Sequence, residues 1–191
     1  MKLLGIIALG LANLSGQADC ITVNASCPTG WISVSPFCYM YFGSSEGSYD
    51  KTQDKCRFLH PEAHLLEFRK PEHGENFLRA VKAGKFPNTY FGWLGLSDFD
   101  GDGIYSWHDG SKITEEMKDY LGLTFNSTNT DNHCVMMDYA WNFKVPDEPL
   151  RFQLQPFRCN RFFTMICMML AKAEKANDRS SQILTVSIKV T

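Results

Sequence analysis

The chain has 191 residues, of which 44% are hydrophobic and 21% are charged, and its formal net charge is −2. This is the composition of a globular protein, which excludes an intrinsically disordered chain and a collagen-like repeat. The near-neutral charge gives no basic footprint, so we expect no nucleic-acid partner. Seven cysteines in a chain long enough to bury a core indicate an oxidising compartment, and their odd number leaves at least one thiol over.

Residues 1–18 have the pattern of a secretory signal peptide. Lys2 precedes an apolar run at residues 3–14, and Gly16-Gln17-Ala18 supplies the small residues of a cleavage site. A membrane anchor is the alternative, but a span needs about 20 apolar residues and Asn13 interrupts this run. We therefore expect a secreted, extracellular protein with no stable membrane span.

Residues 19–26 form a short polar lead-in to the domain. It holds Cys20 and the sequon Asn24-Ala25-Ser26, and a second sequon begins at Asn126. In a secreted protein such sequons accept glycans and favour surface positions. We therefore expect Asn24 and Asn126 to be glycosylation sites.

The first half of the domain is expected to form a hairpin and then two helices. Apolar residues alternate with turn formers in residues 27–42, which predicts the hairpin. Residues 49–59 hold few helix breakers and predict a helix, with Tyr49, Cys56, Phe58 and Leu59 on one face.

The second predicted helix opens at Pro71, a residue suited to the first helical turn. Its apolar stripe has the spacing i, i+3, i+4, i+7 and consists of Gly74, Phe77, Leu78 and Val81. Gly84 is a plausible stop for this helix.

The second half is expected to be strand-rich. Short strands are predicted at residues 90–96, 104–107, 134–139 and 162–167. The polar stretch 109–133 predicts a long functional loop. Residues 169–191 are expected to be a tail that is ordered only where it meets a sheet edge. Helices followed by short antiparallel strands predict an α+β fold. The six cysteines from Cys27 onward allow many pairings, and their spacing selects none.

Several motifs, in order along the chain, resemble those of a long-form C-type lectin-like domain. Cys27-Pro28-Thr29-Gly30-Trp31 followed by Cys38-Tyr39 is similar to the opening hairpin of that family. Trp93-Leu94-Gly95-Leu96 resembles its Trp-Ile-Gly-Leu signature, and Trp107-His108-Asp109-Gly110-Ser111 resembles the Trp-x-Asp-Gly-Ser that follows. The resemblance covers residues 27–168. It implies two helices flanking two small antiparallel sheets, a long irregular loop region and a set of disulfides.

The disulfide pattern that the resemblance implies is Cys27–Cys38, Cys56–Cys167 and Cys134–Cys159. Cys20 is then left over, and it either bridges two chains, is capped or is free. Its position in the lead-in favours an interchain bridge, which would make a disulfide-linked homodimer.

The calcium-sugar motifs of the family are degenerate in this chain. Family members that bind sugar hold one calcium ion with Glu-Pro-Asn or Gln-Pro-Asp in the long loop and with Trp-Asn-Asp before the fourth framework cysteine. Neither loop motif lies between Gly110 and Cys134. Glu148-Pro149-Leu150 follows Cys134 and lacks the amide, and Trp141-Asn142-Phe143 has phenylalanine where aspartate is expected. Counting back from Cys159 instead gives Leu154-Gln155-Pro156, which fits the motif less well. Phenylalanine supplies no oxygen for calcium, which needs six to eight oxygen ligands.

We therefore expect a ligand surface of a different kind, formed by the long loop and residues 141–155. The candidate ligand-binding residues are Asn129, Asp131, Asn132, Trp141, Asn142 and Glu148. A lectin with a non-standard calcium cage, in which loop amides replace the missing motifs, is the alternative interpretation.

A second calcium signal lies upstream of the long loop. Asp98, Asp100, Asp102 and Gly103 have the spacing of an EF-hand loop, but the predicted flanks are strands, so a hairpin turn is the simpler interpretation. The resemblance also puts Asp98 and Asp102 where some family members hold an auxiliary calcium. The sequence thus allows calcium as a cofactor without requiring it.

No catalytic site is predicted. His60 and His64 are four residues apart, but the acidic residue is misplaced for the zinc-protease motif and Pro61 interrupts the helix. His133 adjoins Cys134, which we expect to be oxidised and therefore not a nucleophile. We expect a non-enzymatic recognition module for a glycan or an extracellular protein ligand. A structural or oligomerising component linked through Cys20 is the alternative from another class.

Overall fold

The structure is a computed structural model that describes residues 25–123, 133–140 and 151–173. The helices are α1 (Tyr49–Leu59), α2 (Pro71–Lys82) and α3 (Glu115–Leu121). The strands are β1 (Ala25–Ser26), β2 (Ile32–Val34), β3 (Phe37–Gly47), β4 (His64–Leu65), β5 (Thr89–Ser97), β6 (Ser106–Trp107), β7 (Cys134–Ala140), β8 (Gln153–Phe157), β9 (Phe163–Leu170) and β10 (Lys172–Ala173). The expected α+β class is confirmed.

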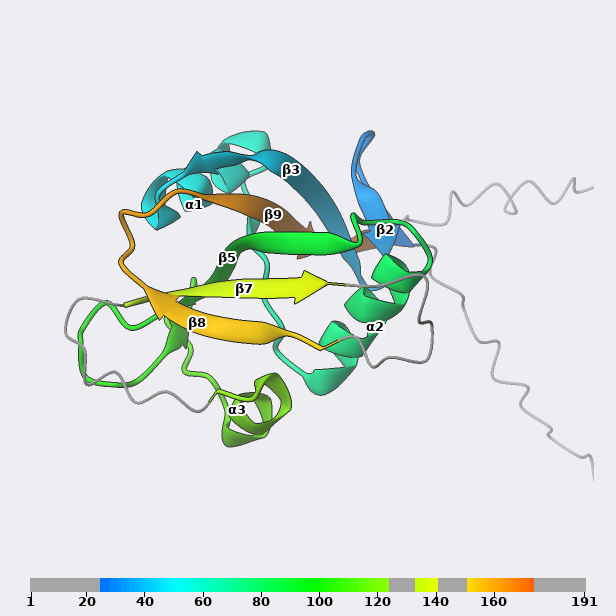
Figure 1. Ribbon diagram of the computed structural model, residues 1–191. Coiled ribbons are helices and arrows are strands. Elements are labelled where there is room, and N and C mark those ends of the chain that lie inside the picture. The colour runs from blue at the N-terminus through cyan, green and yellow to red at the C-terminus, as the bar shows by residue number, and fades with distance from the viewer. Residues whose placement is uncertain (1–24, 124–132, 141–150, 174–191) are drawn as a thin grey trace, which may run out of the picture.

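One mixed sheet organises the molecule, with α1 on one side and α2 and α3 toward the other (Figure 1). Its strand order is β2-β3-β9-β5-β7-β8, with β4 paired to β9 and β6 paired to β5. All of these pairings are antiparallel except β5 with β9, which run parallel through Gly92 with Thr164 and Trp93 with Met165. The described residues form two sheets, this one and the two-stranded β1-β10, but the larger sheet differs from the small antiparallel sheets that were expected, because the short parallel contact between β5 and β9 makes it mixed.

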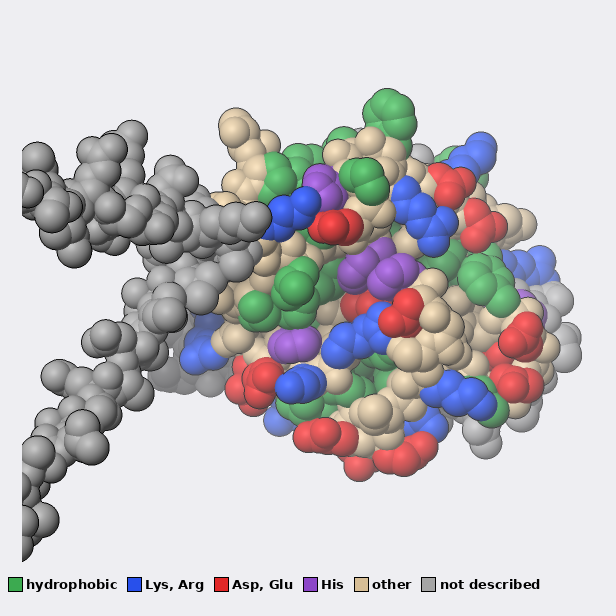
Figure 2. Space-filling view, turned by 180° about the vertical axis from the view of Figure 1, so that it is seen from behind, with side chains coloured by type: hydrophobic (Ala, Val, Ile, Leu, Met, Phe, Trp, Pro, Cys, Tyr) green, Lys and Arg blue, Asp and Glu red, His purple; other side chains and the backbone are tan. Residues whose placement is uncertain are grey.

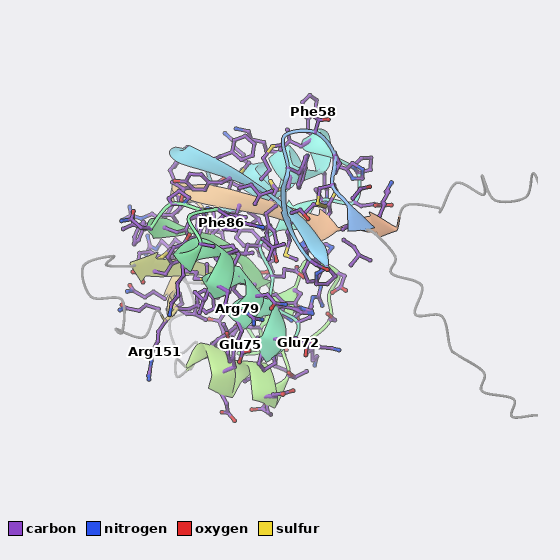
Figure 3. The ribbon with its side chains drawn as sticks, turned by 90° about the vertical axis from the view of Figure 1, so that its right-hand side faces the viewer. Phe58, Glu72, Glu75, Arg79, Phe86 and Arg151 are labelled. Carbon is purple, nitrogen blue, oxygen red and sulfur yellow. A yellow bond between two sulfur atoms is a disulfide. The ribbon has the colours of Figure 1, made fainter. Side chains whose placement is uncertain are left out.

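The predicted helix α1 has the expected bounds, but its apolar face differs from the prediction. Tyr49 and Cys56 are buried, whereas the Phe58 side chain is 89% exposed and projects from α1 into solvent (Figure 3). Residues two apart on a helix do not share a face, so Phe58 cannot lie beside Cys56. The stripe predicted for α2 is confirmed, since Gly74, Phe77 and Val81 are buried and Leu78 packs against the core.

A third helix occupies part of the stretch that we expected to be irregular. The side chain of Thr114 accepts a hydrogen bond from the Met117 N–H at the start of α3, and Gly122 ends the helix with a φ of 64°. Met117 and Leu121, one turn apart, are buried against the core. The local signals for this helix are present in the sequence as a cap, a buried pair and a terminal glycine.

Four strands of the described chain were not predicted, namely β1, β4, β8 and β10. Strand β8 lies at the edge of the sheet, where Pro156 is tolerated because an edge strand needs no hydrogen bond from every residue. Strand β10 pairs with β1, so the first residues of the expected tail do meet a sheet edge. Conversely, the strand expected at residues 104–107 is reduced to Ser106–Trp107.

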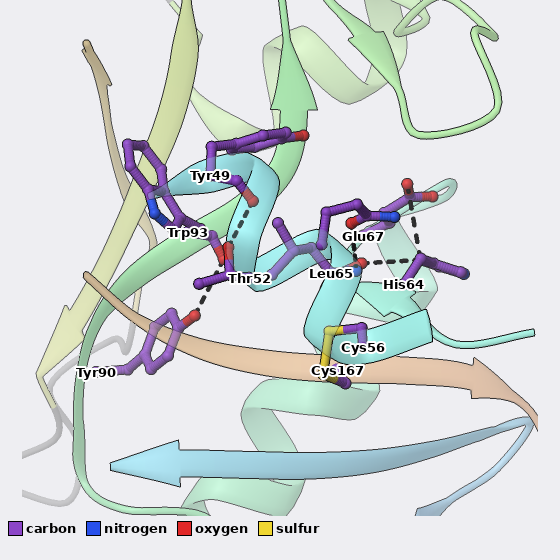
Figure 4. Close-up of a disulfide and its surroundings, with 10 residues drawn as sticks. Tyr49, Thr52, Cys56, His64, Leu65, Glu67, Tyr90, Trp93 and Cys167 are labelled. Atoms are coloured by element: carbon purple, nitrogen blue, oxygen red, sulfur yellow. Dashed lines mark hydrogen bonds and ion pairs between the residues drawn. A yellow bond between two sulfur atoms is a disulfide. The ribbon is translucent and has the colours of Figure 1, made fainter. Parts of the chain in front are cut away.

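Three disulfides tie these elements together, and they are the three that the family resemblance implies. Cys27–Cys38 joins the chain before β2 to β3, and Cys134–Cys159 joins β7 to the chain after β8. Cys56–Cys167 pins α1 to the central strand β9 (Figure 4). In the part of the chain that the structure describes, no helix has the length and apolar character that crossing a membrane requires.

Candidate functional site

The ligand-binding residues expected on the long loop and its neighbour lie outside the described residues. They are Asn129, Asp131, Asn132, Trp141, Asn142 and Glu148, and Cys20, Asn24 and Asn126 also lie outside. The described chain on either side places the two intervening segments. Residues 124–132 connect the end of α3 to β7, and residues 141–150 connect β7 to its neighbour β8. The predictions for these residues therefore stay predictions.

The described aspartates of the second calcium signal form a turn between β5 and β6. Asp98 is 1% exposed, and its two carboxylate oxygens accept the backbone N–H groups of Asp102 and Gly103 at 3.1 and 3.0 Å. The Asp102 carboxylate accepts the backbone N–H of Ile104 at 2.8 Å. Strands flank this turn, as expected, so it is not an EF-hand.

These hydrogen bonds fit a turn-forming role better than a calcium cage. Calcium needs six to eight oxygens, whereas both oxygens of Asp98 already face backbone donors. Within the described ranges, no third histidine, cysteine or acidic ligand is grouped with Asp98 and Asp102. Calcium at this turn stays a prediction, and the residues would contribute oxygen ligands only if the turn hydrogen bonds rearranged.

A buried carboxylate that the sequence did not predict lies nearby, at Glu67. Its side chain is 1% exposed, and one carboxylate oxygen pairs with the Arg69 guanidinium through bonds of 2.6 and 2.7 Å. The other oxygen accepts the backbone N–H of His108 at 3.0 Å and contacts the His108 Nδ1 at 2.6 Å. The residues come from the chain after β4 and the chain after β6, which are distant in sequence, so no local pattern could have revealed the contact.

Two stacked imidazoles cover this carboxylate. The rings of His64 and His108 lie 3.9 Å apart at 13°, and the His64 Nδ1 is 2.8 Å from the carbonyl oxygen of Leu65 and 3.7 Å from Glu67 (Figure 4). Burial lowers the pKa of His64 below its ordinary value of 6.5, although the Glu67 carboxylate acts in the opposite direction. Figure 2 shows a histidine patch near the centre of the back face, with acidic and basic side chains beside it.

His64, Glu67 and His108 have the donor types of a transition-metal site. Their ligand atoms lie within 4.8 Å of one another, and they are the one such group in the described part of the chain. Both oxygens of Glu67 are, however, already engaged with Arg69 and His108. The arrangement is therefore that of a hydrogen-bonded buried charge, which holds the chain after β6 against the chain after β4.

The motif after β6 is tied to the same network. Arg69 also pairs with Asp109 at 3.1 Å, hydrogen bonds to Ser111, and lies over the Trp107 ring with 5.3 Å from its Cζ to the ring centroid. Hydrogen bonds from the Ser111 side chain and backbone, with Arg69 close by, hold the pKa of Asp109 well below its usual range. The network thus fixes the surface turn at residues 107–111.

A cavity of about 520 Å³ opens beside this turn, between α1 and the chain around β6. Its wall contains aromatic and aliphatic side chains, and its polar groups are carboxylates, an amide, hydroxyls and one guanidinium. The lining residues are Tyr49, Asp50, Gln53, Asp54, Arg57, Ser97, Phe99, Asp100, Ile104, Ser106, Trp107, His108 and Gly110. No sequence pattern indicated this cavity, because its two walls come from segments about fifty residues apart.

Comparisons with known proteins agree with this architecture. The model of the C-type lectin domain family matches residues 45–169, more than half of the chain. The human "C-type lectin domain family 17, member A" is 36% identical over 105 residues, which are 54% of this chain and 25% of that protein. The "Alpha-N-acetylgalactosamine-specific lectin" of Patiria pectinifera is 26% identical over 169 residues, covering 80% of this chain and 86% of that protein. The chain thus spans only a quarter of the human relative's length.

Solved structures show the same fold at low sequence identity. The C-type lectin CEL-I from Cucumaria echinata superposes with a TM-score of 0.54 at 16% identity, covering 76% of this chain and 99% of that one. The cow carbohydrate-recognition domain of CD23 gives 0.53 at 21% identity, covering 78% and 99%. The family that the model describes is one of recognition domains that bind carbohydrate or protein ligands and are generally not enzymes. This chain belongs to the C-type lectin domain family.

Proposed function

We propose that this chain is a secreted, extracellular recognition module that binds a glycan or the glycan of a glycoprotein without the usual calcium cage of its family. The observation that carries the proposal is the loss of oxygen ligands from the calcium-sugar motifs. In the candidate motif Trp141-Asn142-Phe143 a phenylalanine takes the place of the aspartate, and the other candidate position, counted back from Cys159, holds Leu154-Gln155-Pro156. The loop before Cys134 has neither Glu-Pro-Asn nor Gln-Pro-Asp. A phenyl ring supplies no oxygen, and calcium needs six to eight oxygen ligands.

Membership of the family supports binding as the function, and the degenerate motifs support a contact made by the protein's own side chains. The loop residues proposed for this contact are Asn129, Asp131, Asn132, Trp141, Asn142 and Glu148. Three disulfides in one domain support an oxidising, extracellular location, as does the leader pattern in residues 1–18.

A glycan array probed with the mature protein, once with calcium and once with EDTA, tests the proposal. We expect the same glycans to bind in both buffers. Binding that EDTA abolishes would overturn the calcium-independent mechanism and would direct attention to a cage built from Asn129, Asp131 and Asn142. If folded protein binds no glycan in either buffer, the glycan proposal is wrong and a protein ligand takes its place.

A second candidate function is favoured by the cysteine count. Six of the seven cysteines form disulfides in the structure, which leaves Cys20 as the one without a partner in that set. A covalent dimer through Cys20 would make the chain an oligomerising component. A band at twice the monomer mass on a non-reducing gel, lost in a Cys20→Ser variant, is the expected result. A monomer band under both conditions would contradict it.

A further inference from the structure

We infer that the cavity between α1 and β6 is a calcium-independent site for a neutral pyranose sugar. The inference rests on the proposed function, because it names a site and a ligand class for glycan recognition. The cavity is about 520 Å³, large enough for a single sugar ring, and lies within the usual range for small-ligand sites. The described residues that line it come from two segments, residues 49–57 and 97–110.

The walls of the cavity supply an apolar surface that suits the C–H face of a pyranose. Tyr49 and Trp107 are almost fully buried, so their rings are the immobile part of this apolar surface. Phe99 is 58% exposed and contacts Tyr49 edge to face, with 5.7 Å between ring centroids. An exposed aromatic ring held by a buried one is a preformed stacking surface that loses little freedom when a ligand covers it.

One residue that lines the cavity contains an unsatisfied donor. Gln53 is 7% exposed, and its Oε1 accepts the backbone N–H of Leu65 at 3.0 Å, which fixes the direction of the amide. Its Nε2 is buried and has no hydrogen-bond partner among the described residues. A buried donor without a partner is costly, so a ligand oxygen that reaches the Nε2 once the side chains over it move aside would bind favourably. Sugar hydroxyls accept as well as donate hydrogen bonds, and therefore match both this donor and the carboxylates of the rim.

The rim carries a net negative charge, which selects against acidic sugars. Among the described residues, Asp50, Asp54 and Asp100 line it with a single guanidinium, that of Arg57. Arg57 is itself 3.8 Å from Asp54, so its charge is partly shared with that carboxylate. Like charges brought close together repel, and we therefore expect sialylated or sulfated sugars to be excluded while neutral hexoses enter.

The position of His108 in the cavity wall is fixed by contacts with residues that do not line the cavity. The His108 backbone N–H and Nδ1 both contact the buried Glu67 carboxylate, which Arg69 holds in turn. This network makes the turn at residues 107–110 a rigid wall. A rigid wall opposite a helix gives the shape selectivity that a flexible loop would not provide.

The test is an NMR titration of the mature protein in EDTA with millimolar methyl α-D-mannopyranoside, methyl β-D-galactopyranoside, N-acetylglucosamine and N-acetylneuraminic acid. We expect at least one neutral sugar to shift the amides of residues 49–57 and 97–110, and the acidic sugar to shift none. Phe99→Ala should weaken this binding about tenfold, because it removes the exposed stacking ring. Phe58→Ala is the matched control, since that ring is also a solvent-exposed phenylalanine but is not among the residues that line the cavity, and the variant should bind as the wild type does.

The outcomes separate this inference from the proposed function. EDTA-resistant glycan binding that Phe99→Ala leaves unchanged would overturn the cavity site and leave the proposed function standing. Binding of the acidic sugar at the same amides would overturn the ligand class. If neither the array nor the titration detects a sugar, both proposals are wrong.

Discussion

At the residue scale, the least expected feature is the fully buried Glu67 carboxylate. Sequence reasoning predicted the turn aspartates Asp98 and Asp102 because their spacing is local, and the Asp-Gly pattern indicates a turn directly. It could not predict Glu67 with His108, because these residues are 41 positions apart and meet only through the sheet. The loop residues proposed for ligand binding lie outside the described chain, so their prediction rests on the sequence alone.

Removing the charge of Glu67 should destabilise the fold. In Glu67→Gln the Arg69 guanidinium loses its buried carboxylate and keeps Asp109 and Ser111 as partners, and His108 loses a charged acceptor. We expect the free energy of unfolding to fall by about 2–3 kcal/mol. Urea denaturation with the disulfides intact measures this change in the free energy of unfolding. The control is Glu72→Gln, whose exposed pair with Lys70 should be worth less than about 0.5 kcal/mol. Equal effects of the two substitutions would contradict the prediction.

His64 should make the stability sensitive to mild acid. Its pKa is lower in the folded state than the ordinary 6.5, chiefly through burial, so below that pH the unfolded chain binds more protons. Stability is therefore complete above about pH 6.5 and declines as the pH falls toward the folded-state pKa. The charged groups facing His64 are Glu67, Arg69 and His108. Urea midpoints measured from about pH 7 to about pH 5 should fall less steeply for His64→Gln. Parallel curves would show that another group titrates.

At the element scale, hydrophobic periodicity predicted α1 and α2, whose apolar residues repeat along one face. It missed α3, for which the local sequence signals are the residues at its two ends. The bounds of α1 and the opening of α2 at Pro71 agree with the prediction. Helix α3 was missed because it is only seven residues long, too short for a convincing stripe, although Thr114 and Gly122 mark both of its ends. The joining of the strands into one sheet is not a local property, and no pattern within β5 or β9 announces their parallel contact.

That contact depends on Gly92. A Cβ at this position would lie 2.5 Å from the backbone oxygen of Thr164 and would meet the buried Tyr90 ring. Because a backbone atom cannot move aside cheaply, we expect Gly92→Ala to lower the free energy of unfolding by about 2 kcal/mol. Gly43→Ala is the control, since its Cβ would meet only the Tyr41 side chain at 3.2 Å. Thermal unfolding of the two variants compares them, and a Gly92→Ala protein as stable as wild type would disprove the constraint.

At the scale of the whole molecule, the family resemblance predicted more than the residue patterns did. Spacing alone left the cysteine pairing open, whereas the ordered motifs implied the three disulfides that the structure contains. The cavity beside α1 was not predicted, because its walls meet only once the sheet, the helix and the turn after β6 are assembled.

The disulfides should differ in their contribution to stability according to the chain that each one closes. Cys56–Cys167 spans 111 positions and Cys27–Cys38 spans 11. Loop-closure entropy predicts losses of about 5 and about 3 kcal/mol when each pair is replaced by alanine. Guanidinium unfolding of the two double variants gives the comparison. A larger loss for the Cys27–Cys38 pair would mean that packing, rather than the entropy of the unfolded chain, sets the order.

The pairing of β1 with β10 has a mechanical consequence. Ala25 lies opposite Ala173 and Ser26 opposite Lys172, so the two ends of the described domain leave from one point (Figure 1). A force pulling these ends apart first unzips this two-residue ladder, which offers little resistance. Beyond it the bond between Cys56 and Cys167 takes the 111-position loop out of the load path and shields that loop from extension. Strand β3 and most of helix α1, between Cys38 and Cys56, stay in the load path. Tension would therefore peel β3 from β9 and reach the cavity beside α1, while β5, β7 and β8 inside the closed loop keep their arrangement.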